Sequence, residues 1–145
     1  MKFENSVIIS QPVEQVFEFA TNPEHNAKWQ TGTLELEMTS ENHFGAGATY
    51  RCVNRFRGKH IKSEGIITDY APGKSCHIRI RTGDFTGECS MFFKAVEGGT
   101  KLTAFGDLDM RYFKLLKMTA KRKINQQIKK DLLKLKYMLE NGRKF

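Results

Sequence analysis

Residues 110–142 read MRYFKLLKMTAKRKINQQIKKDLLKLKYMLENG, and this stretch decides the fold. It contains no proline, and no glycine before Gly142, so the sequence predicts one uninterrupted helix over residues 110–141. At 1.5 Å per residue such a helix is about 45 Å long, more than a small core alone requires. Apolar residues recur at helical spacing along one face: Phe113, Leu116, Ala120, Ile124, Ile128, Leu132, Leu135 and Leu139.

Both ends of the predicted helix carry stop or start signals. Asp107 and Asp109 precede it, where acidic groups complement the positive end of the helix dipole, and Asp109 can serve as the N-cap. Asn141 and Gly142 supply a left-handed stop at the other end.

The face opposite the apolar stripe is crowded with Lys and Arg. Residues 111–145 hold 12 of the 24 Lys and Arg residues and two acids, a net +10, whereas the whole chain is +8. Residues 1–110 hold 12 bases and 14 acids, a net −2, so the basicity belongs to the last helix. We interpret this face as solvated, with attraction to an anionic membrane or an acidic ligand headgroup as the alternative. No nucleic-acid partner is expected, because the face lacks aromatic interleaving and a known reading motif.

The rest of the chain is typical of strands and turns. Residues 2–10 alternate as a strand, and two short helices follow over 12–20, capped by Ser10 or Gln11, and 23–28. Six more strands are predicted over residues 31–39, 48–57, 60–70, 75–81, 85–96 and 100–109. Because the turns are hairpin-length, the sheet is expected to be antiparallel, and it can bury one face only against the long helix. The sequence therefore predicts one α+β domain over 1–145: a curved seven-stranded antiparallel sheet wrapped around a long C-terminal helix, with two short helices after the first strand.

Composition bounds the class of protein. The length of 145 residues suits one domain. Cys52, Cys76 and Cys89 are odd in number and widely spaced, which favours free thiols and a cytoplasmic location. There is no signal-peptide pattern and no apolar run long enough for a membrane span. The four histidines are dispersed and no nucleotide-binding glycine motif is present, so neither a metal nor a cofactor is expected.

Several motifs spread over the chain resemble those of the SRPBCC superfamily. They are VIISQPVEQVF (7–17), TNPE (21–24) ending in Trp29, GATY (47–50), DYAPG (69–73), GGTKLT (98–103) and LLKLK (132–136). That superfamily includes START lipid-transfer domains, birch-pollen-allergen-like proteins and polyketide cyclase/dehydrase-like proteins. The resemblance implies a helix-grip fold, with a cavity between sheet and long helix that holds a hydrophobic or amphipathic small molecule. None of the motifs is catalytic, so the resemblance implies a site and not a reaction.

The candidates for lining such a cavity are residues on the apolar side of the predicted strands and helices. They are Trp29, Tyr50, Cys52, Asn54, Phe56, Tyr70, Ile78, Ile80, Phe93, Leu116, Ala120, Ile124 and Ile128. Asn54 lies between Cys52 and Phe56 with Tyr50 on the same side, so Asn54 and Tyr50 offer a donor–acceptor pair for a ligand carbonyl or hydroxyl. Tyr70 is expected at the rim. The alternative is that Asn54 satisfies local backbone groups at a kink in the strand.

Other polar residues are interpreted as structural or solvent-facing. His60 and Glu64 share one parity and are a conceivable acid–base pair, but their neighbours Lys62 and Thr68 indicate a solvent face. The polar parity of two strands carries Arg51, Arg55, Arg57, Arg79 and Arg81. We interpret these arginines as an outer face balanced by acids such as Glu35, Glu37 and Glu88, with an anion-binding patch as the alternative.

The sequence thus predicts binding, and carriage or sequestration, of a small hydrophobic or amphipathic ligand. Two alternatives stay open. One is a small enzyme of the cyclase, dehydratase or hydrolase type in the same cavity, for which no catalytic residue can be assigned. The other is a module that docks on a partner or an anionic surface through the basic helix. Both a monomer and a homodimer are compatible with the sequence, and Leu133 and Tyr137, off the main stripe, mark a small second contact surface.

Overall fold

The computed structural model describes residues 2–56, 58–83, 85–108 and 117–142. Its elements follow the predicted order of one strand, two short helices, six strands and a long helix. They are β1 (Lys2–Ile9), α1 (Val13–Thr21), the 3-10 turn η1 (Pro23–His25), α2 (Asn26–Trp29), β2 (Thr33–Met38), β3 (Thr49–Phe56), β4 (Lys59–Ala71), β5 (Ser75–Thr82), β6 (Phe85–Val96), β7 (Gly99–Leu108) and α3 (Lys117–Glu140).

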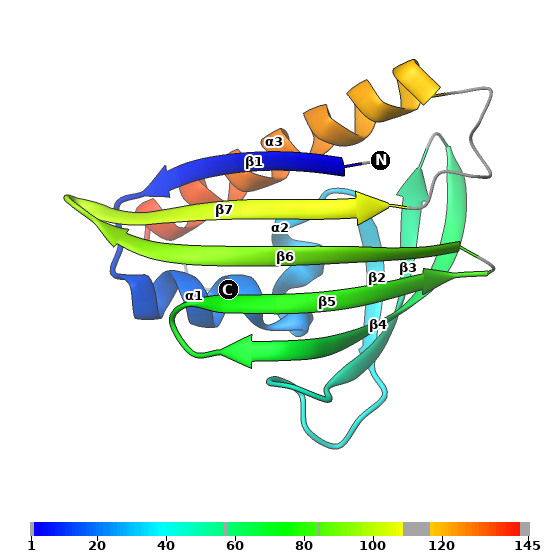
Figure 1. Cartoon of the computed structure of the whole chain (residues 1–145), viewed down its shortest axis with the longest axis horizontal. Coiled ribbons are helices and arrows are strands. Elements are labelled where there is room, and N and C mark those ends of the chain that lie inside the picture. Colours follow the sequence, from blue (N-terminus) through cyan, green and yellow to red (C-terminus); the bar gives the residue numbers. More distant parts are fainter. Residues whose placement is uncertain (1, 57, 84, 109–116, 143–145) are drawn as a thin grey trace.

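The seven strands form one antiparallel sheet in the order β1-β7-β6-β5-β4-β3-β2. The helices lie on one face of this sheet, and β4, β3 and β2 curve back toward them at one side (Figure 1). The sheet therefore has a concave inner face that meets α3 and a convex outer face. The predicted fold class, an α+β helix-grip arrangement, is confirmed.

Large aromatic rings lie over glycines on the inner face. Cross-strand pairing sets Tyr50 beside Gly65 and Phe3 beside Gly106. A Cβ at Gly65 would overlap the ring of Tyr50, and one at Gly106 would overlap the ring of Phe3. Only glycine leaves room for rings to lie this close to the backbone of the next strand, so these positions help the sheet to curve.

Helix α3 uses the predicted apolar stripe, but the burial of that stripe changes along the helix. Leu132, Leu135 and Leu139 are buried, whereas Ile124 and Ile128 are only half-buried. Gly142 follows with φ of 62°, so the predicted left-handed stop is confirmed. The predicted start of the helix, with Asp109, Phe113 and Leu116, lies outside the described residues, as does the side chain of Ala120. Asp107 is a residue of β7 and pairs with β6, so it does not lie at the start of the described helix.

The C-terminal end of α3 is bonded to the turn between β1 and α1. The Ser10 N–H donates to Glu140 Oε2 (2.8 Å), Gln11 Nε2 donates to the Leu139 carbonyl (3.1 Å), and Lys136 Nζ donates to the Ile8 carbonyl (2.6 Å). The prediction that Ser10 or Gln11 caps α1 is wrong, because the N-cap position is Pro12. The polar groups of Ser10 and Gln11 stabilise the end of α3 instead.

Two further contacts fix the middle of α3. The carboxylate of Asp131 accepts hydrogen bonds from the Thr31 N–H (3.1 Å) and from Gln127 Nε2 (2.8 Å). Asn5 Nδ2, on β1, donates to Asn125 Oδ1 (2.8 Å). The helix is therefore held to β1 at one edge of the sheet and to the residues that precede β2 at the other.

The outer face carries charges that alternate from strand to strand. Glu37, Arg51, Glu64 and Arg81 are cross-strand neighbours on β2, β3, β4 and β5. Within this row, Arg51 lies 3.3 Å from Glu37 and Arg81 lies 2.9 Å from Glu64. The interpretation as an exposed outer face balanced by acids is confirmed for Arg51, Arg79 and Arg81, since Arg79 lies 3.7 Å from Glu88. Arg55 is exposed, and Arg57 lies outside the described residues.

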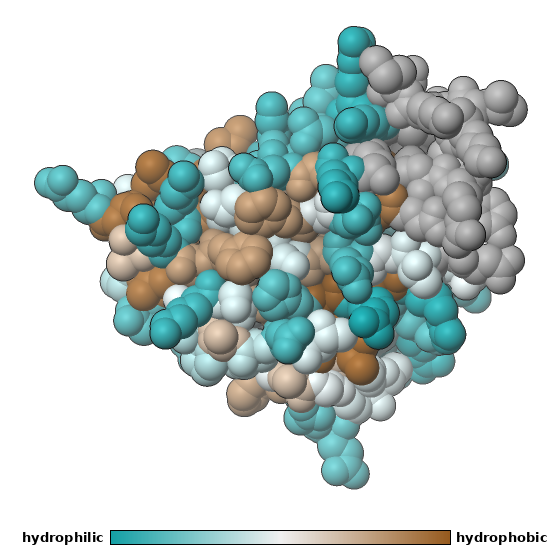
Figure 2. Space-filling view, in the orientation of Figure 1, coloured by the Kyte–Doolittle hydropathy of each residue, from teal (hydrophilic) through white to brown (hydrophobic). Residues whose placement is uncertain are grey.

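Apolar side chains interrupt this polar outer surface (Figure 2). Phe92 and Phe105 are partly exposed on β6 and β7, with ring centroids 5.4 Å apart in an edge-to-face contact. His77 lies edge-to-face against Phe92 (5.4 Å), and its Nδ1 lies 2.6 Å from Ser90 Oγ. These rings pack mainly against one another, because the helices of the described structure lie on the opposite face of the sheet (Figure 1).

Candidate functional site

The inner face is tightly packed at the end where α1 and the end of α3 lie. Ile9, Leu102 and Leu135 have no exposed surface there. Phe17 from α1 contacts Phe93 edge-to-face, with centroids 5.0 Å apart. We call this the packed half of the inner face. It is a hydrophobic core whose central side chains are fully buried.

The other half of the inner face, toward β2 and β3, is different. Cys52, Ile78, Ile80 and Cys89 occupy the inward parity of their strands, yet all four are only half-buried. Ile124 and Ile128 of α3 are half-buried as well. Inward side chains that keep accessible surface line space that other side chains do not fill. We call this the open half.

Polar side chains from three strands meet in the open half. Asn54 Nδ2 donates to Ser63 Oγ (2.8 Å) and lies 3.4 Å from Cys52 Sγ, while Cys52 Sγ and Ser63 Oγ are 2.9 Å apart. Thr33 Oγ1 lies 3.1 Å from Gln30 Oε1 and 3.4 Å from Asn54 Oδ1. We call Gln30, Thr33, Cys52, Asn54 and Ser63 the polar cluster.

Two thiols and one phenol of the inner face have raised pKa values. Burial raises the pKa of the Cys76 and Cys89 thiols to about 11 each. Burial, and after it the nearby thiols of Cys52, Cys89 and Cys76, raise the pKa of the Tyr50 hydroxyl above its usual range. Protonated thiols are poor nucleophiles and a protonated phenol is a poor base, so these groups suit binding better than catalysis.

Trp29 places a polar atom in the interior without a partner. The side chain is 4% exposed and packs in the same core cluster as Leu132 and Phe93. Among the residues that the structure describes, no acceptor lies within hydrogen-bonding distance of its Nε1. A buried N–H without a partner is rare in native proteins, so this indole lacks an acceptor that a bound molecule can supply.

Residues 1–140 match the model of the family described as polyketide cyclase / dehydrase and lipid transport. The chain belongs to this family. The SRPBCC resemblance inferred from the sequence motifs is thereby confirmed. No curated protein matches the chain. In the described residues, no helix is long and apolar enough to cross a membrane.

Solved structures share the fold of this family member at low identity. The Zhui aromatase/cyclase from Streptomyces sp. R1128 superposes with a TM-score of 0.80 at 16% identity, over 97% of this chain and 94% of that chain. The protein TTHA0849 from Thermus thermophilus gives 0.75 at 18%, over 99% and 100%. Ara h 8.0201 gives 0.74 at 16%, over 97% and 99%. At these identities the likeness establishes the fold alone.

The structure brings some of the predicted lining residues of this cyclase/dehydrase-family chain together and separates others. Cys52, Asn54, Ile78 and Ile80 share the inward parity of β3 and β5 in the open half. On α3, Ile124 is half-buried, and Ile128 packs against the core cluster that holds Leu132 and Leu135. Phe93 and Tyr70 contact Phe17 in the packed half, with Tyr70 at 5.1 Å from that ring. Tyr50 is buried beside Gly65, and it is not among the described hydrogen-bond partners of Asn54. The side chains of Phe56, Leu116 and Ala120 lie outside the described residues.

Sequence reasoning missed Ser63, Thr33, Gln30 and Cys89. Ser63 occupies the inward parity of β4, two residues before Gly65, so strand alternation is a usable signal for it. Thr33 and Gln30 precede a register shift between Thr33 and Glu35, which alternation alone does not reveal. Cys89 is predicted only as a free thiol, although its parity also points inward, opposite Ile78.

Other hollows of the described surface have less suitable linings. One of about 690 Å³ lies over β2–β5, where its lining residues are mainly outward-facing and include Glu37, Arg51, Glu64 and Arg81. Cys52 and Ser63 of the polar cluster are also among its lining residues. The four charged residues are exposed and largely paired with one another, so the groove offers no dry, shaped site. His60 and Glu64 are both exposed, and Glu64 is paired with Arg81, so the solvent-face interpretation of these two residues is confirmed.

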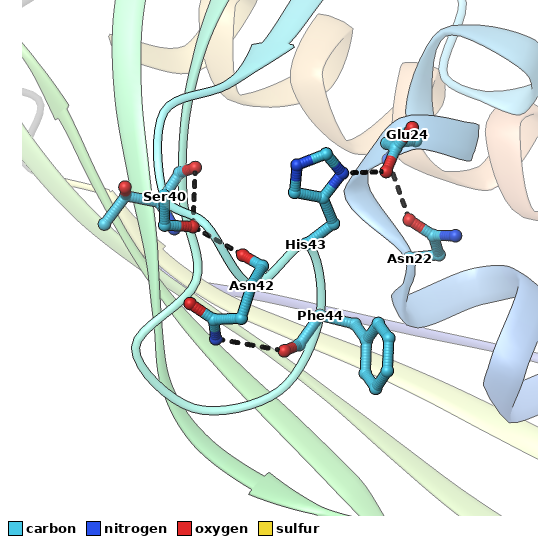
Figure 3. A network of polar contacts seen from close by, with 7 residues as sticks. Asn22, Glu24, Ser40, Asn42, His43 and Phe44 are labelled. Atoms are coloured by element: carbon cyan, nitrogen blue, oxygen red, sulfur yellow. Dashed lines mark hydrogen bonds and ion pairs between the residues drawn. The ribbon is translucent and has the colours of Figure 1, made fainter.

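A smaller hollow of about 490 Å³ lies beside α1, with Phe19, Phe44, Tyr70 and Leu139 among its lining residues. Phe44 belongs to the loop between β2 and β3, which bends toward η1 (Figure 3). His43 Nδ1 lies 2.7 Å from Glu24 Oε1 and fixes this loop to η1. Within the loop, Ser40 Oγ donates to the Asn42 carbonyl (2.6 Å), and Asn42 Nδ2 donates to the Phe44 carbonyl (3.2 Å).

Proposed function

We propose that the protein binds a small, mainly apolar molecule in the open half of its inner face, between the sheet and α3. The observation that carries this proposal is the half-burial of Ile78, Ile80 and Cys89, whose side chains face the interior. Removing apolar ligand surface from water contributes about 25 cal/mol per Å². The polar cluster beside these residues supplies the few directional contacts that fix an orientation.

The family of the chain supports this proposal, because its description names lipid transport as well as cyclase and dehydrase chemistry. The enzyme alternative requires an inward group that exchanges protons near neutral pH. Cys76, Cys89 and Tyr50 have raised pKa values, so they do not meet that requirement. Binding and carriage are therefore favoured over catalysis, and free thiols fit a cytoplasmic site of action.

The test fills the open half without touching the packed half. Ile80 pairs with Gly65 on one neighbouring strand and Gly87 on the other, so a larger side chain at this position projects into the open half. Ile80→Trp is expected to weaken binding of a neutral, environment-sensitive fluorophore such as N-phenyl-1-naphthylamine by at least tenfold. Ile66→Trp, on the exposed outer parity of the adjacent strand, is the matched control and should bind like the wild type.

Native mass spectrometry of the purified protein gives an independent readout. We expect a retained non-covalent molecule in the wild type and its loss in Ile80→Trp, with both proteins showing a single cooperative thermal transition. Wild-type protein that neither retains a molecule nor binds the fluorophore contradicts the proposal. So does an Ile80→Trp variant that is folded and binds as tightly as the wild type.

A second candidate function is docking on an anionic surface, and one observation favours it. Lys121, Arg122, Lys123, Lys129 and Lys130 of α3 are all exposed, with Asp131 and Glu140 as the acids of the described helix. Both acids are already hydrogen-bonded within the fold. Co-sedimentation with vesicles containing phosphatidylserine, compared with pure phosphatidylcholine vesicles, tests this function. Binding should fall with added salt and with Lys121→Glu, Arg122→Glu and Lys123→Glu combined.

A further inference from the structure

Among the described strand residues of the inner face, the only formal charge is that of Lys59, which pairs with Phe56 at the exposed start of β4. Charged residues of β3, β4 and β5 such as Arg51, Glu64 and Arg81 point outward in cross-strand rows. The cross-strand neighbours of Ile78 and Ile80 are neutral, so a charged group moved beside these two side chains loses its hydration without gaining an opposite charge from an adjacent strand. The open half therefore suits an uncharged ligand.

Hydrogen-bonding capacity in the polar cluster is unevenly used. The Thr33 hydroxyl has one hydrogen but lies near two carbonyl oxygens, Gln30 Oε1 at 3.1 Å and Asn54 Oδ1 at 3.4 Å. One hydrogen cannot serve both acceptors well, and the shorter contact is the one to Gln30. Asn54 Oδ1 is thus an acceptor with spare capacity.

The donor side of Asn54 is already used. Its Nδ2 points to Ser63 Oγ at 2.8 Å and to Cys52 Sγ at 3.4 Å. The residue lies on the inward parity of β3 and is half-buried, so it is not sealed in the core. A molecule that binds here gains most if it brings a hydrogen-bond donor.

Trp29 Nε1 shows the complementary deficit. This N–H is buried, and no described residue accepts its hydrogen. Trp29 belongs to the core cluster that holds Phe93 and Leu132, so its N–H is a separate deficit from that of the polar cluster. In the polar cluster itself, the missing group is a donor to Asn54 Oδ1. A hydroxyl group can both donate and accept, and it does so without a charge.

We propose that the ligand is an uncharged alcohol or phenol whose hydroxyl group binds at the polar cluster and donates to Asn54 Oδ1, while its apolar body lies against Ile78, Ile80 and α3. This inference rests on the proposed function, because it names the class of molecule that the open half accepts. It excludes carboxylates, amines and sulfonates as the preferred ligands of this site.

The test is a matched series of one carbon skeleton at neutral pH. Wild-type protein loaded with N-phenyl-1-naphthylamine is titrated with 2-naphthol, 2-methoxynaphthalene and 2-naphthoate. We expect 2-naphthol to displace the fluorophore at about tenfold lower concentration than the methyl ether, which accepts but cannot donate. 2-Naphthoate should be the weakest of the three, because its carboxylate must be desolvated.

Asn54→Ala separates the hydroxyl contact from general apolar binding. This variant should bind the methyl ether within about twofold of the wild type and should lose the preference for 2-naphthol. Asn42→Ala, an exposed asparagine of the β2–β3 loop, is the matched control and should keep the preference.

The outcomes distinguish this inference from the proposed function. Equal affinity of wild-type protein for 2-naphthol and its methyl ether overturns the hydroxyl contact, and equal or tighter binding of 2-naphthoate overturns the requirement for neutrality. In both cases binding in the open half still stands. If the fluorophore and all three naphthalenes fail to bind the folded wild type, the proposed function itself is wrong. These wild-type measurements decide the inference even if Asn54→Ala does not fold.

Discussion

The packed and open halves belong to the inner face of one sheet, yet they differ in how completely they are filled. In the packed half, Ile9, Leu102 and Leu135 have no exposed surface. In the open half, Ile80 and Asn54 face the interior and remain half-buried. One sheet therefore combines a filled core with a region where inward side chains keep accessible surface, and this region is the binding site that we propose. Along α3, burial rises from the half-buried Ile128 to the buried Leu132, although both belong to the packed side.

The largest expected effect tests this difference through stability. Leu135→Ala should reduce the free energy of unfolding by about 2–5 kcal/mol, because it leaves a cavity in a filled core. Ile80→Ala should cost less than about 1.5 kcal/mol, since its side chain is only half-buried. Urea denaturation measures both values. Leu133→Ala, exposed on the same helix, is the control and should change stability by less than about 0.5 kcal/mol. If Leu135→Ala and Ile80→Ala lowered the free energy of unfolding equally, the two halves would not differ in how completely they are filled.

A second prediction concerns Asp131, which holds α3 to the residues before β2. Asp131→Ala should cost about 1–3 kcal/mol, because it leaves the Thr31 N–H and the Gln127 amide without an acceptor. Asp131→Asn keeps an acceptor oxygen and should cost much less. Comparison of the two variants by urea denaturation at neutral pH separates the hydrogen bonds from the charge. If Asp131→Asn lowers the free energy of unfolding as much as Asp131→Ala does, the negative charge of Asp131 stabilises this contact and the hydrogen bonds alone do not.

The pH dependence of the two carboxylate anchors should have opposite signs. Burial raises the pKa of Asp131 despite its hydrogen bonds from Thr31 and Gln127. The folded state then holds this proton more tightly than the unfolded state, so stability falls as pH rises from the unfolded pKa to the folded pKa. Asp131→Asn should remove this decline, as measured by thermal unfolding across the acidic range.

Glu140, at the packed end, behaves in the reverse manner. Hydrogen bonds from Lys136 and from the Ser10 N–H lower the pKa of this carboxyl. The charged Glu140 side chain therefore stabilises the fold at pH values above its pKa in the unfolded chain. This stabilisation is lost as the pH falls through the pKa of Glu140 in the folded protein. Glu140→Gln should cost about 0.2–1 kcal/mol at neutral pH and almost nothing in strong acid. A cost that does not change with pH would contradict the role of the charge.

The smallest effect is chemical and compares two thiols. Cys76 has no exposed surface, whereas Cys89 is half-buried beside Ile78, and the pKa of each is raised to about 11. In a Cys52→Ser background, both should react slowly with iodoacetamide at neutral pH. At higher pH, Cys89 should react before Cys76, and N-phenyl-1-naphthylamine should slow Cys89 alone. Peptide mapping by mass spectrometry measures this order, and equal rates would indicate equal access.

Most of the fold could be predicted from the sequence because its signals are local. Strand alternation located all seven strands, and the proline-free apolar stripe located α3. The predicted cap of α1 is wrong, since the competing partners of Ser10 and Gln11 lie about 130 residues away at Glu140 and Leu139. Contacts across that separation have no local pattern.

The candidate site was less accessible to sequence reasoning for a related reason. The alternation of side chains along a strand places Asn54 and Ile80 on the inward side of the sheet. It does not show which half of the inner face is filled by other side chains. The polar cluster joins β2, β3 and β4 through their pairing register, including the shift after Thr33. Register depends on the turns and on packing across the whole sheet, so Ser63 becomes a partner of Asn54 only in three dimensions.

The alternating charges of the outer face have a consequence for how the whole molecule is oriented. Because Glu37, Arg51, Glu64 and Arg81 largely cancel one another, the sheet side contributes little net field. The exposed cations of α3 are not cancelled in this way, so the molecule has a permanent electric dipole with its positive pole on that helix. Near a negatively charged body, within a Debye length of about 8–10 Å, the resulting torque turns the molecule so that α3 leads. The part of the molecule nearest to that body is then the basic face of α3.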